Sequence, residues 1–181
     1  MTSTPANAIP GNFVTSAYEQ AKYDATLAAL PRPRYRRGLE IGCSIGVLTA
    51  RLAGRCASLL AIDVSKKALD AARMRCRTLP NVALENISVP AEWPAGTFDL
   101  IMLSEVVYYL DAGDVSRLAD RVSASVEPGG NVVLVHWTGT TDYPLSGDDA
   151  AELFMTALGR SARRIRQQRT HAYRLDALAL P

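Results

Sequence analysis

The chain has 181 residues, of which 48% are hydrophobic, and its formal net charge at pH 7 is +2. This length and hydrophobic content predict one compact domain with a sizeable core. The near-neutral charge argues against a nucleic-acid partner, and the longest apolar runs, such as residues 132–135, are far too short to span a bilayer, so no membrane partner is expected.

The N-terminal stretch is polar, contains prolines and lacks the basic start and apolar core of a signal peptide. We expect a flexible arm over residues 1–12 and a single domain over residues 13–181. Cys43, Cys56 and Cys76 have neither C-x-x-C spacing nor a nearby pair of histidines, which argues against a disulfide framework and against a metal site. Reduced thiols are typical of a cytoplasmic protein, and we expect a monomer or a weak dimer.

A first helix is expected ahead of the sheet. Ser16 and Glu19 form a capping box, and alanines and leucines recur at helical spacing until Pro31 ends the pattern. The sequence leaves two interpretations open: an ordinary amphipathic helix packed on one edge of the sheet, or a helix that lies over a ligand.

Residues 39–46, which read Leu-Glu-Ile-Gly-Cys-Ser-Ile-Gly, predict a strand, a glycine-bearing loop and the start of a helix. Units of this kind bind nucleotides because glycines let a ligand approach the backbone and the helix N-terminus offers unpaired N–H groups. The dinucleotide fingerprint G-x-G-x-x-G is incomplete, since Ser44 stands where a middle glycine is expected. Asp63 ends the next strand 21 positions after Gly42, a separation that suits an acid binding the hydroxyls of a ribose.

The rest of the chain alternates strands and helices. Strands are expected at residues 58–63, 82–86, 98–103, 131–135, 165–168 and 173–180, and helices after the caps Ser65, Asp111 and Ser146. The strand at residues 98–103 is almost continuously apolar and is therefore expected near the centre of the sheet. This alternation predicts a doubly wound α/β fold with a mainly parallel sheet and right-handed crossovers.

Three motifs in the expected order carry a resemblance to a known family. Residues 40–46 resemble the acid and glycine-rich loop of class I S-adenosylmethionine-dependent methyltransferases, residues 98–110 resemble their fourth-strand motif, and residues 127–130 resemble the turn before their fifth strand. Residues 39–49, residues 104–110 and the helix at Tyr18-Glu19 further resemble the branch of the nodulation protein S N-methyltransferases. The resemblance to the superfamily covers residues 13–138, and it implies a Rossmann-like sheet of seven strands that ends in an antiparallel C-terminal hairpin.

The resemblance implies that S-adenosyl-L-methionine binds across the carboxyl ends of the strands. The residues expected to contact it are Tyr18, Lys22, Glu40, Gly42, Cys43, Ser44, Gly46, Asp63, Val64, Ser88, Val89 and Ser104. Asp63 is expected to hold the ribose, and Gly42 to pass so close to the cofactor that a β-carbon would collide with it. Lys22 is expected to reach the methionyl carboxylate, with a solvent-exposed lysine as the alternative. Ser88 stands at or near the position where related enzymes often carry an acid that contacts adenine.

The expected reaction is methyl transfer to a nitrogen or oxygen of a small acceptor that is amino-sugar-like or bears an amine. If the acceptor is an amine, its proton must leave, and Glu105, Tyr108 and His136 at the strand ends are the candidates to receive it or to orient the nitrogen. The alternatives are packing at a helix start for Tyr108 and a backbone contact that closes a strand for His136. The polar loop at residues 138–147 is expected to hold the acceptor.

Two other functions remain open on the sequence alone. A NAD(P)-binding oxidoreductase would use the same fold, but the incomplete fingerprint and the lack of a recognisable hydride-transfer dyad disfavour it. A non-catalytic domain that binds an S-adenosyl ligand is the other alternative, because Ser44 and Ser88 are changes that a decayed enzyme shows. The arginines that crowd residues 160–169 are either protective charges on an edge strand or a patch for an anionic substrate or partner.

Overall fold

The computed structural model describes residues 17–160 and 162–181. The arm expected over residues 1–12 and the capping residue Ser16 lie outside this part of the chain. The strands of the described residues are β1 (Tyr35–Ile41), β2 (Cys56–Asp63), β3 (Val82–Asn86), β4 (Phe98–Ser104), β5 (Val126–Trp137), β6 (Arg163–Arg169) and β7 (Tyr173–Ala179). The helices are α1 (Ala17–Ala28), α2 (Val47–Leu52), α3 (Lys66–Cys76), α4 (Ala112–Ser125) and α5 (Gly147–Leu158), with the short 3-10 helices η1 (Ala53–Arg55) and η2 (Val107–Tyr109).

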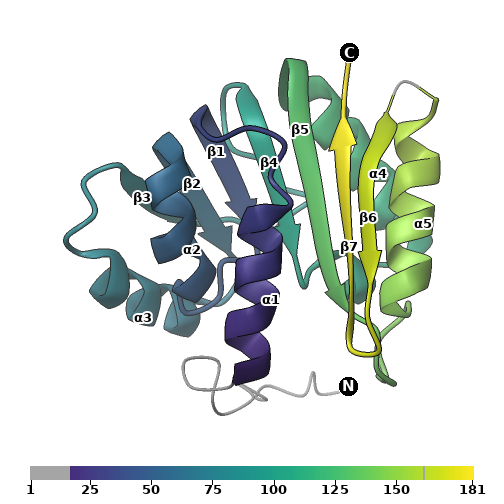
Figure 1. The fold of residues 1–181 in the computed structure, drawn as a ribbon, viewed down its shortest axis with the longest axis horizontal. Helices are drawn as coiled ribbons and strands as arrows, with labels where there is room; N and C mark the ends of the chain where they lie inside the picture. Colours follow the sequence, from purple (N-terminus) through teal and green to yellow (C-terminus); the bar gives the residue numbers. More distant parts are fainter. Residues whose placement is uncertain (1–16, 161) are drawn as a thin grey trace.

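The strands of the described part form one seven-stranded sheet in the order β3-β2-β1-β4-β5-β7-β6 (Figure 1). The pairs from β3 to β5 are parallel, whereas β7 is antiparallel to both β5 and β6. The doubly wound sheet and the antiparallel C-terminal hairpin that the sequence predicts are therefore confirmed. Within the same residues, none of the helices has the length and apolar character needed to cross a membrane.

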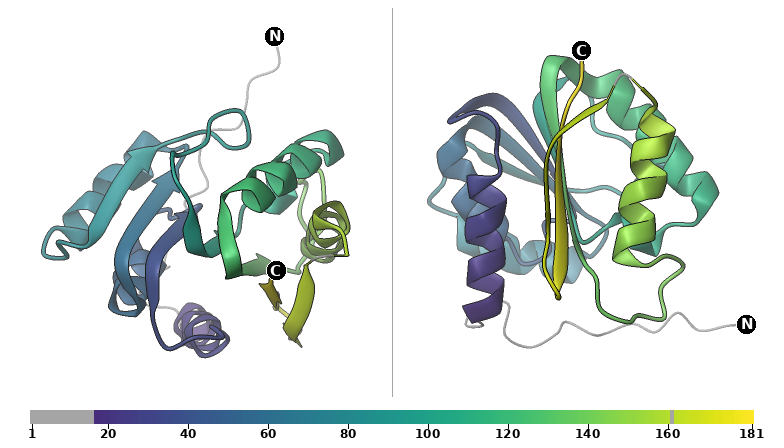
Figure 2. Two further views of the ribbon diagram at one scale, coloured as in Figure 1. Left: turned by 90° about the horizontal axis from the view of Figure 1, so that it is seen from above. Right: turned by 45° about the vertical axis from the view of Figure 1, so that its right-hand side comes forward.

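Helices cover both faces of the sheet, as the two views in Figure 2 show. On one face, Leu52 of α2 shares an apolar cluster with Met102 of β4. On the other face, Leu118 of α4 and Phe154 of α5 share a second cluster with Leu103 of β4. Because β4 lies between these layers, every one of its residues is buried, as its apolar sequence predicts.

Side-chain caps set the starts of three helices where the sequence predicts them. Ser65 accepts a hydrogen bond from the backbone N–H of Ala68, and Asp111 accepts one from the N–H of Asp114. Ser146 caps α5 in the same way. Each cap satisfies one of the backbone donors that a helix N-terminus leaves unpaired.

The start of β5 differs from the prediction of a strand over residues 131–135. The strand begins at Val126, directly after α4, and residues 127–130 lie within it instead of forming a separate turn. Val126 is opposite Phe98 and Asn131 is opposite Leu100, so the register shifts and β5 carries extra residues that bulge out of the ladder. Gly129 adopts a φ of 73° in this bulge, a conformation that favours glycine.

Asp99 has a structural role at the amino end of the parallel strands. Its two carboxylate oxygens accept hydrogen bonds of 2.8 Å from the backbone N–H groups of Arg36 and Arg37, and its side chain is buried. This contact joins β4 to β1 at the end of the sheet opposite the candidate site. Asp99 therefore does not belong to that site.

Candidate functional site

The acidic and hydroxyl side chains singled out in the sequence gather at the carboxyl ends of the parallel strands. Glu40 near the end of β1 is level with Met102 in β4, and Ser104 at the end of β4 is level with Val135 in β5. Asp63 ends β2 on the other side of β1. These strand ends form the lower edge of the sheet in Figure 1, beside the N-terminal half of α1.

The loop between β1 and α2 is shaped by three residues with left-handed backbone conformations. Gly42, Ser44 and Gly46 have φ values of 82°, 49° and 78°. Gly46 caps α2, and a β-carbon there would lie 3.0 Å from both the Cα and the Cβ of Ala72, so α2 and α3 pack tightly at this point. Ser44 holds a conformation that is uncommon outside glycine, asparagine and aspartate, as residues at functional sites often do.

Gly42 has a different structural reason from the one that the sequence suggested. A β-carbon at Gly42 would lie 2.2 Å from Cγ2 of Val106 and 2.7 Å from the backbone oxygen of Ser104. A side chain at position 42 would therefore collide with the protein itself, whether or not a cofactor is bound. Gly42 is required so that the loop after β1 can pass against the end of β4.

Asp63 is half-buried and organises this loop. Its Oδ2 accepts a hydrogen bond of 2.8 Å from the N–H of Ser44, and its Oδ1 accepts one of 2.8 Å from the N–H of Ser65. Each carboxylate oxygen can accept further hydrogen bonds. Asp63 is thus fixed in orientation and still has acceptor capacity for hydroxyl groups. The next residue, Val64, is 69% exposed and offers an apolar surface beside it.

Glu40 is almost completely buried, and its Oε2 has no hydrogen-bond partner in the described residues. The hydroxyl of Thr49, also buried, likewise has no partner there. Burial raises the pKa of the Glu40 carboxyl to about 7, and the charge of Asp63 adds to this shift. A buried acceptor without a partner is costly, so Glu40 is suited to receive a donor from a ligand.

Lys22 is buried, so the alternative of a solvent-exposed lysine is wrong. Its Nζ lies 2.9 Å from Oε1 of Glu105 and 3.1 Å from Oε2 of Glu19. Burial acts to lower the pKa of Lys22, but the two carboxylates raise it above its ordinary value. The ammonium that was expected to reach a methionyl carboxylate is therefore paired with two acidic side chains of the protein.

Glu105 and Tyr108 are joined by a hydrogen bond and do not have the properties of proton acceptors. The hydroxyl of Tyr108 donates to Oε2 of Glu105 over 2.5 Å, and the backbone N–H of Trp137 donates to the same oxygen over 3.0 Å. Burial acts to raise the pKa of Glu105, but Lys22 and these donors hold it below its ordinary value. Burial and the Glu105 charge raise the pKa of Tyr108.

His136 is buried at the end of β5, with its ring 5.3 Å from that of Tyr108. Its Nε2 accepts a hydrogen bond of 3.2 Å from the N–H of Val107, and its Nδ1 has no partner among the described residues. Burial lowers the pKa of His136 to about 4, so the ring is neutral at pH 7. With Nε2 acting as an acceptor, Nδ1 carries the proton and is a donor instead of a base.

The loop at residues 138–147 borders a polar hollow of about 310 Å³. The hollow is lined by Thr138, Gly139, Thr140, Thr141 and Ser146. Beside it lies an aromatic pair that the sequence did not single out as a unit. The rings of Tyr109 and Tyr143 lie 4.3 Å apart, and both side chains are substantially exposed. Only the presence of a tyrosine in each segment could have signalled this pair.

The other expected contact residues lie around the same strand ends. Tyr18 of α1 donates a hydrogen bond of 3.4 Å to the backbone oxygen of Ala172. Cys43 has a buried thiol whose pKa is raised by that burial, so it is not reactive. Ser88 is exposed and its N–H donates to Glu92, while Val89 is half-buried. The structure does not bring Ser88 into a defined contact with the other site residues.

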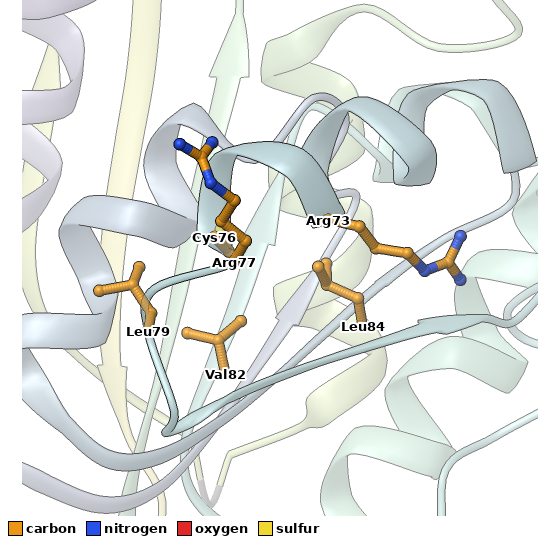
Figure 3. Close-up of a pocket in the computed structure, with 6 residues that line it drawn as sticks. All are labelled: Arg73, Cys76, Arg77, Leu79, Val82 and Leu84. Atoms are coloured by element: carbon orange, nitrogen blue, oxygen red, sulfur yellow. The ribbon is translucent and has the colours of Figure 1, made fainter.

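A second hollow, of about 250 Å³, lies outside this site (Figure 3). It is lined by Arg73, Cys76, Arg77, Leu79, Val82 and Leu84. Val82 begins β3, and the amino ends of the parallel strands are opposite the edge where Asp63 and Glu40 lie. The hollow therefore does not belong to the candidate site.

The C-terminal arginines are partly used in ion pairs with α5. Arg164 lies 3.2 Å from Glu152, and Arg169 lies 2.7 Å from Asp148. The side chain of Arg166 donates to the backbone oxygen of Ala28. These contacts favour a structural role on the edge strand β6 for Arg164, Arg166 and Arg169.

The raised pKa of Glu40 predicts a specific dependence of stability on pH. The folded protein binds this proton more tightly than the unfolded chain, so stability is lost as the pH rises from about 4.5 through about 7. Glu40→Gln should remove up to roughly 3 kcal/mol of this loss. Urea unfolding at pH 5 and pH 8 measures it, with Glu85→Gln on β3 as the exposed control. A wild-type loss equal to that of Glu40→Gln would contradict the assignment.

Comparisons with known proteins agree with this geometry. Residues 5–127 match the family model for nodulation protein S (NodS). Nodulation protein S of Rhizobium tropici is 32% identical over 108 residues, which are 59% of this chain and 45% of that protein. The chain spans about half the length of the curated relatives that it matches.

Two crystal structures extend the similarity to most of the chain. A protein from Pseudomonas syringae, provisionally described as a methyltransferase, is 38% identical, with a TM-score of 0.76 over 90% of this chain and 98% of the other. The N-methyltransferase NodS from Bradyrhizobium japonicum, in complex with S-adenosyl-L-homocysteine, has a TM-score of 0.81 at 21% identity, over 97% of this chain and 94% of the other. Because residues 5–127 match its family model, the chain belongs to the nodulation protein S family.

Proposed function

We propose that this protein is a methyltransferase that uses S-adenosyl-L-methionine to methylate a nitrogen or oxygen of a small acceptor, with an amino-sugar-like amine as the preferred candidate. The observation that carries the proposal is the carboxylate of Asp63, held by two backbone N–H groups beside the glycine-bearing loop. The structural relative from Bradyrhizobium japonicum is an N-methyltransferase in complex with S-adenosyl-L-homocysteine. Family membership and this arrangement support the same class of reaction.

The residues at the strand ends fit an S-adenosyl ligand. Asp63 has free acceptor capacity for the two ribose hydroxyls, and the exposed side chain of Val64 offers an apolar surface for a base. The unpartnered oxygen of Glu40 is suited to a donor such as the amino group of the methionyl part. When bound, S-adenosylmethionine supplies a methyl group on a sulfonium, from which the sulfur departs readily.

The protein's own contribution is to align the acceptor and exclude water from it. The hydroxyl of Tyr108 donates its proton in a hydrogen bond to Glu105. Its oxygen can therefore accept a hydrogen bond from an N–H or O–H group of the substrate. The protonated Nδ1 of His136 is buried without a partner among the described residues, and it can donate a hydrogen bond to an oxygen or nitrogen of the substrate. These groups orient the acceptor, and the polar hollow beside residues 138–147 provides space for it. An ammonium group of the substrate must therefore lose a proton before it attacks. A neutral amine attacks directly, and the methylated product then loses a proton to water.

A non-catalytic domain that binds an S-adenosyl ligand is the second candidate. One observation favours it: the pKa values of Glu105 and His136 are lowered and that of Tyr108 is raised, and these shifts do not suit a general base. Methyl transfer does not require such a base when the acceptor is already neutral. The two candidates therefore differ in whether a methylated product forms.

Asp63→Ala should weaken the binding of S-adenosyl-L-homocysteine by roughly 2–4 kcal/mol, or about 30- to 1,000-fold, because two charge-assisted hydrogen bonds are lost. Titration calorimetry measures the dissociation constant, and thermal unfolding shows that the variant is folded. Asp70→Ala is the matched control, since Asp70 is an exposed acid on α3 that pairs with Arg73. An unchanged dissociation constant in folded Asp63→Ala would remove this residue from the site.

Labelled S-adenosylmethionine, incubated with the protein and with small amines, amino sugars, phenols or nucleic acid, identifies the acceptor class. We expect label in a small-molecule fraction, with a rate that rises with pH until the bound amine is deprotonated and then levels off. Label found mainly in nucleic acid contradicts the proposed acceptor. Binding of the ligand without any labelled product supports the non-catalytic alternative.

A further inference from the structure

Lys22 is buried although it carries a charge. Only 4% of the residue is exposed, and its Nζ contacts the carboxylates of Glu105 and Glu19. The ammonium also lies 5.5 Å and 5.9 Å from the ring centroids of Tyr18 and Tyr23. Burying an ammonium is unfavourable unless it is paired. These contacts therefore account for the position of Lys22.

Glu105 is the meeting point of three elements. Its carboxylate accepts hydrogen bonds from Lys22 on α1, from the hydroxyl of Tyr108 on η2 and from the N–H of Trp137 on β5. Its backbone has a φ of 56°, which is strained for a glutamate, and its own N–H donates to the oxygen of Val135 over 2.9 Å. A strained residue persists where several neighbours hold it in place.

The segment that contains Glu105 also forms one wall of the glycine-bearing loop. Gly42 comes so close to the backbone of Ser104 and to the side chain of Val106 that no β-carbon fits between them. A shift of Glu105 would therefore move the two neighbours that confine this loop. Glu105 therefore links α1 to the segment that borders the glycine-bearing loop.

We propose that Lys22 and Glu105 are positioning residues, whose ion pair holds α1 against the end of β4 and keeps Tyr108 and the Ser104–Val106 wall in the arrangement that binds the S-adenosyl ligand. In this assignment Lys22 does not bind the methionyl carboxylate and Glu105 does not accept a proton. The identity of the ligand rests on the proposed function, whereas the connection between α1 and the end of β4 does not depend on it.

Variants of the two partners separate this role from a direct contact with the ligand. Lys22→Met and Glu105→Gln keep the side-chain size and remove one charge each. We expect both to weaken the binding of S-adenosyl-L-homocysteine by at least about fivefold, and the double variant to bind no more weakly than the weaker single variant, because all three lose the same interaction. Lys67→Met, an exposed lysine on α3, is the control and should bind like wild type.

A direct contact between Lys22 and the ligand gives the opposite pattern for Glu105. Removing the Glu105 carboxylate would leave the ammonium paired with Glu19 and more available to the ligand, so Glu105→Gln would bind as tightly as wild type or more tightly while Lys22→Met bound more weakly. That result, or effects of the two variants that multiply in the double variant, would overturn the proposal. Titration calorimetry measures the affinities of all five proteins: wild type, the two single variants, the double variant and Lys67→Met.

Amide hydrogen exchange of the ligand-free proteins tests the connection without any ligand. Both single variants should exchange faster in α1 and also in residues 106–110, with Lys67→Met unchanged. Faster exchange confined to α1, or none, would show that the pair only packs the helix. If the wild-type protein fails to bind S-adenosyl-L-homocysteine, the proposed function fails, and the exchange pattern still decides whether Lys22 and Glu105 act together.

Discussion

The contact between Gly42 and the end of β4 is the constraint on which the site depends. The loop after β1 passes so close to Ser104 and Val106 that only glycine fits, and it must then turn sharply to start α2. Ser44 and Gly46 make this turn with left-handed backbone conformations, and the N–H of Ser44 points to Asp63. A contact between two strand ends thus positions the acid that is expected to hold the ribose.

The charges around this contact are arranged for binding and orientation more than for proton transfer. Glu105 is held as a carboxylate by Lys22 and two hydrogen-bond donors, whereas Glu40 is buried with an oxygen that lacks a partner in the described residues. His136 is neutral because burial lowers its pKa to about 4. Displacement of a methyl group from a sulfonium needs alignment and exclusion of water above all, so this arrangement suits the proposed reaction.

The sequence was sufficient wherever the determining interaction is local. The bounds of β3 follow from the local sequence pattern and were predicted correctly. The caps Ser65 and Asp111 act on backbone groups three residues away, and they were also predicted correctly. The predicted start of β5 was wrong because the bulge near its beginning depends on pairing with β4, and no pattern in residues 126–130 indicates that pairing. The mainly parallel sheet followed from the alternation of elements, and its antiparallel C-terminal hairpin followed from the family resemblance.

For the candidate site, the sequence proposed residues but could not identify the partners that each one has in the fold. Lys22 and Glu105 are 83 positions apart, and Tyr109 and Tyr143 are 34 positions apart, so only the fold brings each pair together. The structural role of Gly42 could not be predicted either, because the atoms that exclude a β-carbon belong to Ser104 at the end of β4 and to Val106 just after it. Protonation followed the same rule: burial, which shifts the pKa of Glu40 and His136, is a property of the packed sheet and not of the motif.

We propose that the carboxyl ends of β1, β2 and β4 bind an S-adenosyl ligand and not a nicotinamide dinucleotide. Titration calorimetry of the full chain with S-adenosyl-L-homocysteine and, separately, with NAD distinguishes the two ligands. We expect saturable binding of one S-adenosyl-L-homocysteine per chain and no heat of binding with NAD. Binding of NAD, or the absence of S-adenosyl-L-homocysteine binding to the folded protein, would contradict it.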